Sequence, residues 1–467
     1  MSRINTNIAA LAAQTTYNKN TSDLNTHLER LSSGLRINTG KDDPSGLIAS
    51  ETMRSEMAGI TQAVDNSTRA DNVINTAEGA LNEVSSLLLS LQSLTNQAAN
   101  TGALSKDEID ANQLQVDSIL NSINRISNTT QFNGVKLLNG SLDYTTSGVA
   151  STAISTLAIH AAKLPDNGAQ AINVQVLASA KTGTVSFTGA GVGGSAVTIE
   201  VAGNDGTEQL SFAASAHNSA IAFAVNQLTD STGVSATGSA GGVAFNANQF
   251  GSQHWVSVKT LTGTFANGKT SGTDAKVEVN GTEANVDGLN ARVNTGDLDI
   301  EMTLDKRFNK PDTNGTTFDI TGGGAKFQIG SKVQRQGQIQ IGIQSVATTK
   351  LGDQVIGQLS SLGSGGTNSL VGGNTVQAQK IIDEAIKQVA TQRGRLGALQ
   401  KNVLETNINS LNVALENVTA SESDIRDTDF ATETAALTRS QILVQANQSV
   451  LSQANSAPQS VLRLLQG

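Results

Sequence analysis

Apolar residues recur at intervals of three and four along most of the first 140 positions of the chain. This spacing places them on one face of an α-helix. The first such stretch ends near Gly34, and its other positions are mainly Asn, Thr, Ser and Gln. Its apolar stripe, which we expect to pack against another helix, consists of Ile4, Ile8, Leu11, Leu24, Leu28, Leu31 and Leu35.

A second, longer helix is predicted from residue 44 to about residue 100. Asp43 suits the N-cap, and Pro44 suits the first helical position, where its missing N–H costs no hydrogen bond. A helix of this length measures roughly 80 Å. Sustained heptads indicate coiled-coil-like packing, and the predicted packing stripe is Val73, Ala77, Ala80, Val84, Leu87, Leu91 and Leu94.

A third helix is predicted to start at the capping box formed by Ser105 and Glu108. Its packing face includes Val116, Ile119 and Ile123. Turns are predicted after it, at residues 131–134 and 139–140.

The last hundred residues are again helical by pattern. One stripe runs from Ile382 to Val403, and the next contains Leu404, Ile408, Leu411 and Leu415. A polar segment at 421–429 interrupts the pattern. The final stripe is predicted to contain Leu437, Val444, Leu451, Leu462 and Leu465.

The middle of the chain is rich in Gly, Thr, Ser and Val and follows the period of β-strands. Apolar residues alternate from Leu298 to Leu304, and Asn280-Gly281 predicts a hairpin turn. A short helix is predicted at 218–228. The fold class is therefore mainly α, a coiled-coil-like bundle made by both terminal regions, with an inserted strand-rich part.

Composition narrows the function. Aromatic residues are 3% of the chain, so Ala, Leu, Ile and Val must form its core. The net charge of -9 argues against a nucleic-acid partner. The chain contains no Cys, which excludes disulfides and thiolate metal sites. We find no signal-peptide pattern and no run of 18 apolar residues, so no membrane insertion is expected and these features alone suggest a cytosolic protein.

One catalytic motif matches by letter. Residues 263–270 fit the phosphate-loop pattern G-x-x-x-x-G-K-T, but a strand-like segment follows where such a loop needs a helix. We therefore interpret it as a loop between strands. The four histidines lack metal-ligand spacing, and paired carboxylates lie at helix boundaries where capping explains them. We expect no enzyme activity, no cofactor and no metal.

Motifs at both ends of the chain resemble those of bacterial flagellins. They are Met1 to Asn7, Leu28 to Asn38, Thr130 to Leu138, Ser423 to Asp429 and Ala446 to Gln448. The helical regions that carry them make up about half of the chain. Residues 184–239 resemble a β–α–β insert found in the variable part of many flagellins.

The resemblance implies a layered subunit of the extracellular flagellar filament, which drives swimming. Its expected regions are an inner-core helix at 1–42 paired with another at 428–467, a rod domain made of 43–145 and 323–427 with a β-hairpin, and outer domains at 146–322. It also implies secretion through the flagellar channel without a cleaved signal peptide. This replaces the cytosolic location that the missing signal peptide alone suggested. Implied partners are further copies of the chain, the filament cap, hook-junction proteins, a cytoplasmic export chaperone and O-linked sugars on the insert.

Two alternatives remain open. The chain could be the hook–filament junction protein of the same superfamily, which has similar helical ends. It could also act as an adhesive filament subunit through its insert, whose strand edges offer binding surfaces.

The terminal stripes are narrow and their other faces are small and polar. A single copy could not bury enough apolar surface there to offset the entropy of ordering. We therefore expect residues 1 to about 40 and 428–467 to be disordered in the monomer and to fold on head-to-tail assembly.

Flagellins often present a surface to an innate immune receptor on the second and third helices. In this chain Ser90, Leu94 and Gln115 match that surface, but the charged residues that the receptor favours are replaced. Without them, charge-assisted hydrogen bonds cannot form, and we expect weak recognition.

Overall fold

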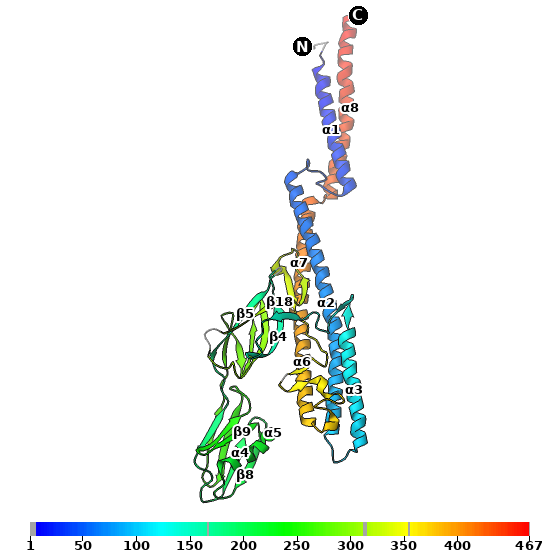
Figure 1. Ribbon diagram of the computed structural model, residues 1–467. Helices are drawn as coiled ribbons and strands as arrows, with labels where there is room; N and C mark the ends of the chain where they lie inside the picture. The colour runs from blue at the N-terminus through cyan, green and yellow to red at the C-terminus, as the bar shows by residue number, and fades with distance from the viewer. Residues whose placement is uncertain (1–5, 166–167, 312–314, 354, 467) are drawn as a thin grey trace. The chain divides into compact units, whose positions relative to one another are not determined.

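The computed structural model describes residues 6–165, 168–311, 315–353 and 355–466 (Figure 1). The chain divides into two compact units. Unit 1 comprises Met1–Arg69, Gln328–Gly337 and Val403–Gly467, and unit 2 comprises Ala70–Phe327 and Gln338–Asn402.

Helices occupy both terminal regions, as predicted. They are α1 (Ile8–Ser33), α2 (Pro44–Ala98), α3 (Lys106–Thr129), α6 (Thr375–Leu399), α7 (Thr406–Arg426) and α8 (Phe430–Gln466), with a π-helix at Gln400–Glu405 between α6 and α7. The middle contains α4 (Asn218–Gln227) and α5 (Thr229–Thr232). Short 3-10 turns are η1 (Arg335–Gly337), η2 (Leu359–Leu362) and η3 (Leu370–Gly372).

Local hydrogen bonds explain where the helices start. The Asp43 carboxylate accepts from the backbone N–H groups of Ser45 and Gly46, at 3.1 and 3.0 Å, so α2 begins at Pro44. Ser105 and Glu108 form the predicted capping box: the Ser105 hydroxyl accepts from the Glu108 N–H, and the Glu108 carboxylate accepts from the Ser105 N–H.

The buried seam of α2 differs from the predicted stripe. Val84 and Leu91 are fully buried, but Val73, Leu87 and Leu94 are only half-buried and flank the seam. Two different heptad stripes pass through Ala77, Val84 and Leu91, and they differ only in the positions between these shared residues. The sequence pattern alone fits both stripes. The structure buries the other one: Ile60, Ala63, Ser67, Ala70, Ile74, Ala77, Leu81, Val84, Leu88, Leu91, Thr95 and Ala98.

The phase change between the two C-terminal stripes coincides with the π-helix. Buried residues in α6 follow the heptad pattern as far as Leu396, and the next buried side chain is Leu404. This interval is one residue longer than a heptad, and the wide turn at Gln400–Glu405 accommodates the extra residue. Beyond it, Ile408, Leu411 and Leu415 are half-buried.

Unit 2 holds a pair of antiparallel sheets. One has the order β14-β13-β5-β18-β3 and the other β15-β16-β17-β4. Their strands are β3 (Tyr144–Ser147), β4 (Ile154–Ala162), β5 (Gln170–Ala178), β13 (Lys276–Val279), β14 (Thr282–Glu283), β15 (Asn285–Asp287), β16 (Asn290–Asn294), β17 (Leu298–Leu304) and β18 (Thr316–Gly323). Asn280 and Gly281, both at positive φ, form the predicted turn between β13 and β14.

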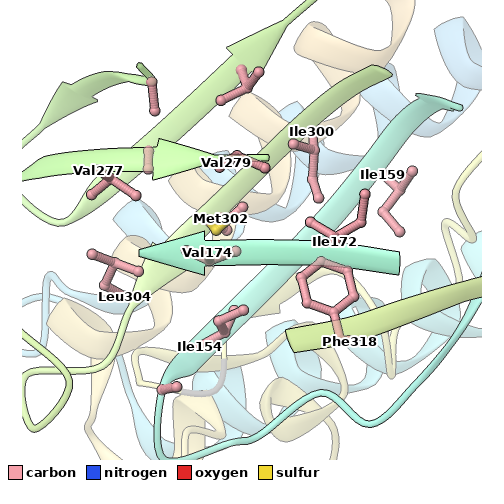
Figure 2. Packing of buried hydrophobic residues seen from close by; sticks show 14 of the residues in the cluster. Ile154, Ile159, Ile172, Val174, Val277, Val279, Ile300, Met302, Leu304 and Phe318 are labelled. Atoms are coloured by element: carbon pink, nitrogen blue, oxygen red, sulfur yellow. The ribbon is translucent and has the colours of Figure 1, made fainter. Parts of the chain in front are cut away.

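The core of this pair lies between the two sheets. Figure 2 shows Ile172, Val174, Val277 and Val279 from one sheet beside Ile300 from the other. Their alternate positions face the core because successive side chains of a strand point to opposite sides.

A second pair of sheets in unit 2 has its own core. The orders are β6-β10-β9 and β12-β11-β7-β8, and α4 packs on β9. The strands are β6 (Thr184–Thr188), β7 (Val197–Ala202), β8 (Thr207–Phe212), β9 (Val234–Ser239), β10 (Gly242–Ala247), β11 (Trp255–Thr262) and β12 (Gly268–Ser271). Ile199, Ile221 and Phe245 are fully buried in this core.

Two-stranded hairpins complete the fold. They are β1 (Gln131–Phe132) with β2 (Val135–Lys136), β19 (Ala325–Gln328) with β20 (Gln338–Ile341), and β21 (Gly352–Asp353) with β22 (Gly357–Gln358). The β19–β20 hairpin lies in the region where the β-hairpin was expected.

Candidate assembly surfaces

The two terminal helices, α1 and α8, pack against each other as an antiparallel pair (Figure 1). Asn7 donates a hydrogen bond to the Ala454 carbonyl oxygen at 2.8 Å, and His27 meets Glu433 twenty residues further along α1. Both contacts are consistent with a single alignment of the two helices along their length. Buried or half-buried side chains recur along α1 with a 3-4 spacing, as expected for the face that packs on α8: Ala10, Ala13, Tyr17, Asn20, Leu24, His27 and Leu31.

A backbone joint closes the base of this pair. The Thr428 N–H donates to the Gly34 carbonyl at 2.9 Å, and the Arg36 N–H donates to the Arg426 carbonyl at 2.7 Å. Leu35 and Asp427 form a β-bridge between these bonds. Gly34 adopts φ 75°, a conformation that glycine reaches without steric cost, and so ends α1.

A polar cluster lies just above the joint. The His27 Nδ1 is 2.6 Å from the Glu433 Oε1, and the Arg30 Nη1 is 3.9 Å from the same oxygen. The Glu433 side chain is 11% exposed, so its charge is largely removed from water and needs these partners. The sequence showed only that the four histidines lack metal-ligand spacing, and it gave no sign that His27 contacts Glu433 from a heptad position of the seam.

Outside the seam, α1 and α8 expose a second set of apolar side chains. Ile8 and Leu11 are 66% and 61% exposed, and Ile442 and Val450 are 61% and 55% exposed. Of the residues described in α1, Ala13 alone is buried. We call Ile8, Leu11, Leu28, Ile442 and Val450 the outward stripe.

The predicted inner-core residues therefore separate into two groups. Leu24, Leu31, Leu35, Leu437, Val444 and Leu451 are half-buried in the pair or at its base, whereas Ile8, Leu11 and Leu28 belong to the outward stripe. Ile4 lies outside the described residues, and so do the side chains of Leu462 and Leu465. Ile442 was not predicted, because it falls outside the sevenfold spacing that drew attention to Leu437 and Val444.

The predicted rod residues of α3 lie on a well-buried face. Val116 and Ile123 are fully buried, and Ile119 is half-buried. Gln113, on the same face, donates to the Leu362 carbonyl and accepts from the Leu370 N–H, both at 2.8 Å. Such bonds fix the loops around α3, and amphipathic periodicity alone did not reveal them.

A charged contact holds α6 against the sheet that contains β17. Arg395 Nη2 lies 3.2 Å from an Asp299 carboxylate oxygen, and Arg292 Nε lies 3.6 Å from the other. Burial raises the pKa of Asp299, while Arg292 acts in the opposite direction. Burial also lowers the pKa of Arg395 to about 10, which still leaves its guanidinium charged at neutral pH.

A groove of about 670 Å³ lies in unit 1, between the start of α2 and the tip of the β19–β20 hairpin. Leu47, Ile48 and Glu51 line one side, and Ser331 and Lys332 line the other. Ile48 is 70% exposed. Ile48 therefore belongs to the exposed apolar side chains of this unit that lie outside the outward stripe, as do Val333, Val413 and Phe430.

The residues that match the immune-receptor surface lie on α2 and α3. Ser90 and Gln115 are exposed and Leu94 is half-buried. The Ser90 hydroxyl donates to the Ser86 carbonyl of its own helix at 3.1 Å.

The structure places strands around the phosphate-loop letters. Residues 263–267 join β11 to β12, which begins at Gly268, so a strand follows this loop where a phosphate loop needs a helix. Among the described residues there is no group of three or more His, Asp or Glu side chains suited to a metal ion. No helix in the described part of the chain is long and apolar enough to cross a membrane.

Comparisons with known proteins agree with this architecture. The bacterial flagellin N-terminal helical region matches residues 4–143, and the bacterial flagellin C-terminal helical region matches residues 379–465. The chain is 32% identical to the flagellin of Salmonella typhimurium over 512 residues and 32% identical to polar flagellin F of Vibrio parahaemolyticus over 476 residues. Each alignment covers 99% of both chains.

Among solved structures, the flagellar hook associated protein-3 of Legionella pneumophila is similar to this chain. It is 15% identical, with a TM-score of 0.33, and the match covers 80% of this chain and 98% of that one. A TM-score this low supports no conclusion about function.

Proposed function

The chain belongs to the bacterial flagellin family, and we propose that it polymerises through its outward stripe into the extracellular filament of a bacterial flagellum. It is a structural subunit rather than an enzyme in this proposal.

The outward stripe carries the proposal. Ile8, Leu11 and Ile442 are each more than 60% exposed although the pairing of α1 and α8 is complete. Burying an aliphatic side chain contributes about 1.5–3 kcal/mol. Neighbouring copies that cover several such residues supply the stabilisation that one chain lacks.

The pairing of α1 and α8 inside one chain leaves the outward stripe exposed to solvent. If a neighbouring copy covers this stripe with a different part of its surface, its own stripe stays exposed and can be covered by the next copy. Head-to-tail contacts of this kind generate an open helical polymer. Because one chain buries so little apolar surface in these segments, residues 1 to about 40 and 428–467 are disordered in the free monomer at low concentration in this proposal.

The experiment is seeded elongation followed by electron microscopy. The intact chain is incubated with short filament seeds, beside a version that lacks residues 428–467. Long filaments from the intact chain only are expected. Fluorescence of Trp255, the only tryptophan, shows whether the insert of the truncated version is still folded. Failure of the intact chain to elongate would overturn the proposal and favour the hook–filament junction protein.

The remaining family properties are part of the same proposal. The chain is exported through the flagellar channel without a cleaved signal peptide, and it meets an export chaperone, the cap and hook-junction proteins. O-linked sugars attach to the insert. The proposed boundaries remain 1–42, 43–145, 146–322, 323–427 and 428–467. Recognition by the innate immune receptor is weak, because Ser90 and Gln115 carry no charge.

A further inference from the structure

The apolar seam between α1 and α8 does not select one register. On α8, Glu433, Leu437, Ser440, Val444, Asn447, Leu451 and Ala454 turn toward α1 with a 4-3 spacing. Counting along the helices from the Asn7–Ala454 and His27–Glu433 contacts places Leu24 level with Leu437, Asn20 level with Ser440 and Tyr17 level with Val444. Apolar and polar layers therefore alternate over this part of the pair.

A displacement by one heptad would preserve this alternation. It would place Leu24 opposite Val444 and Asn20 opposite Asn447, so each layer would again meet a layer of its own kind. The apolar pattern of the seam therefore does not by itself distinguish the two registers. The register must be selected by contacts that do not repeat every seven residues.

Two neighbouring features of unit 1 meet this condition. One is the cluster of His27, Arg30 and Glu433, with its 2.6 Å contact between Nδ1 and Oε1. The other is the backbone joint at Gly34 and Thr428. After a displacement of one heptad Glu433 would no longer meet His27. In the observed register Glu433 is 11% exposed and has these partners to offset its burial, and buried polar groups of this kind can specify register.

We propose that His27 and Glu433 are the side chains that select the register of the terminal helix pair. The inference rests on the proposed function, because the filament is the state in which the pair is fully formed. It goes beyond that function by assigning a positioning role to a histidine that lies in the seam rather than in the outward stripe.

Because the chain contains no cysteine, the register can be read by disulfide cross-linking. The substitutions Leu24→Cys and Leu437→Cys report the observed register, and Leu24→Cys with Val444→Cys reports the register displaced by one heptad. Each pair is placed in the unaltered chain, in His27→Ala, in Glu433→Ala and in Glu29→Ala. Glu29→Ala is the matched control, since Glu29 is an exposed carboxylate of α1.

The variants are added to seeds together with an excess of the unaltered protein, so that they are carried into filaments. An intramolecular disulfide gives a faster-migrating monomer on a denaturing gel, whereas a disulfide between copies gives a dimer. We expect the ratio of displaced to observed cross-link to rise at least roughly tenfold in His27→Ala and Glu433→Ala. The ratio should stay unchanged in Glu29→Ala, and His27→Arg, which places a hydrogen-bond donor beside Glu433, should bring it back toward the original value.

The inference is overturned if filaments form and the displaced pair remains uncross-linked in both alanine variants. The backbone joint would then be sufficient to set the register. Absence of filaments from the unaltered chain is a different outcome, because it would refute the proposed function itself.

Discussion

Three consecutive leucines in α2 allow the packing of the rod to be tested with identical substitutions. Leu88 is fully buried, Leu87 is half-buried and Leu89 is 53% exposed. A change to Ala alters helix propensity by the same small amount at each position. Differences among the three variants therefore report burial alone.

The expected destabilisation follows from that order. Leu88→Ala removes a side chain from the closed seam and leaves a cavity, which costs about 2.7–5 kcal/mol. Leu87→Ala removes a half-buried contact and costs about 1 kcal/mol. Leu89→Ala lies near the surface and changes the free energy of unfolding by less than about 0.5 kcal/mol.

Urea denaturation followed by far-UV circular dichroism measures the unfolding of the helices. Trp255 fluorescence, recorded in the same titration, reports the insert separately and should be unchanged in all three variants. A larger loss for Leu87→Ala than for Leu88→Ala would refute the seam described here. It would indicate that the buried face of α2 is instead the stripe through Val73, Leu87 and Leu94, which the sequence also allows.

Other regions give further expectations. Deleting Asn402, an exposed residue of the π-helix, should leave the melting temperature unchanged or higher because it restores an unbroken heptad, whereas deleting Asn409 in α7 should lower it by several degrees. Phe245→Ala should destabilise the second pair of sheets by about 3–5 kcal/mol, measured by Trp255 fluorescence in urea. Burial raises the pKa of Asp143 above its usual value of 3.8, against the opposing effects of the Tyr144 N–H and Lys350. The folded protein therefore holds the Asp143 proton more tightly than the unfolded chain does. The stability that this gives is fully present below pH 3.8 and is lost as pH rises through the higher pKa of the folded state. Asp143→Asn should thus gain stability relative to the unaltered chain between pH 3 and pH 7, and an equal difference at both pH values in thermal melts would contradict this.

The sequence was most informative where one local signal determines one local structure. The Asn280-Gly281 turn, the Ser105 capping box and the start of α2 at Pro44 all depend on contacts within a few residues. These features need no knowledge of the neighbouring elements.

The sequence was least informative where the choice depends on a neighbour. The two stripes of α2 have the same period, so only tertiary packing decides between Leu87 and Leu88. The role of His27 depends on Glu433, more than 400 positions away in the chain. No spacing rule connects two residues at such a separation.

The central claim is that the outward stripe drives polymerisation. It is tested most directly by the critical concentration for seeded elongation of Ile442→Ser, compared with Gln441→Ser at the adjacent exposed position. Loss of about 1.5–3 kcal/mol of burial predicts a rise of roughly tenfold or more for Ile442→Ser and a change within about twofold for Gln441→Ser. Equal critical concentrations for the two variants would contradict the account.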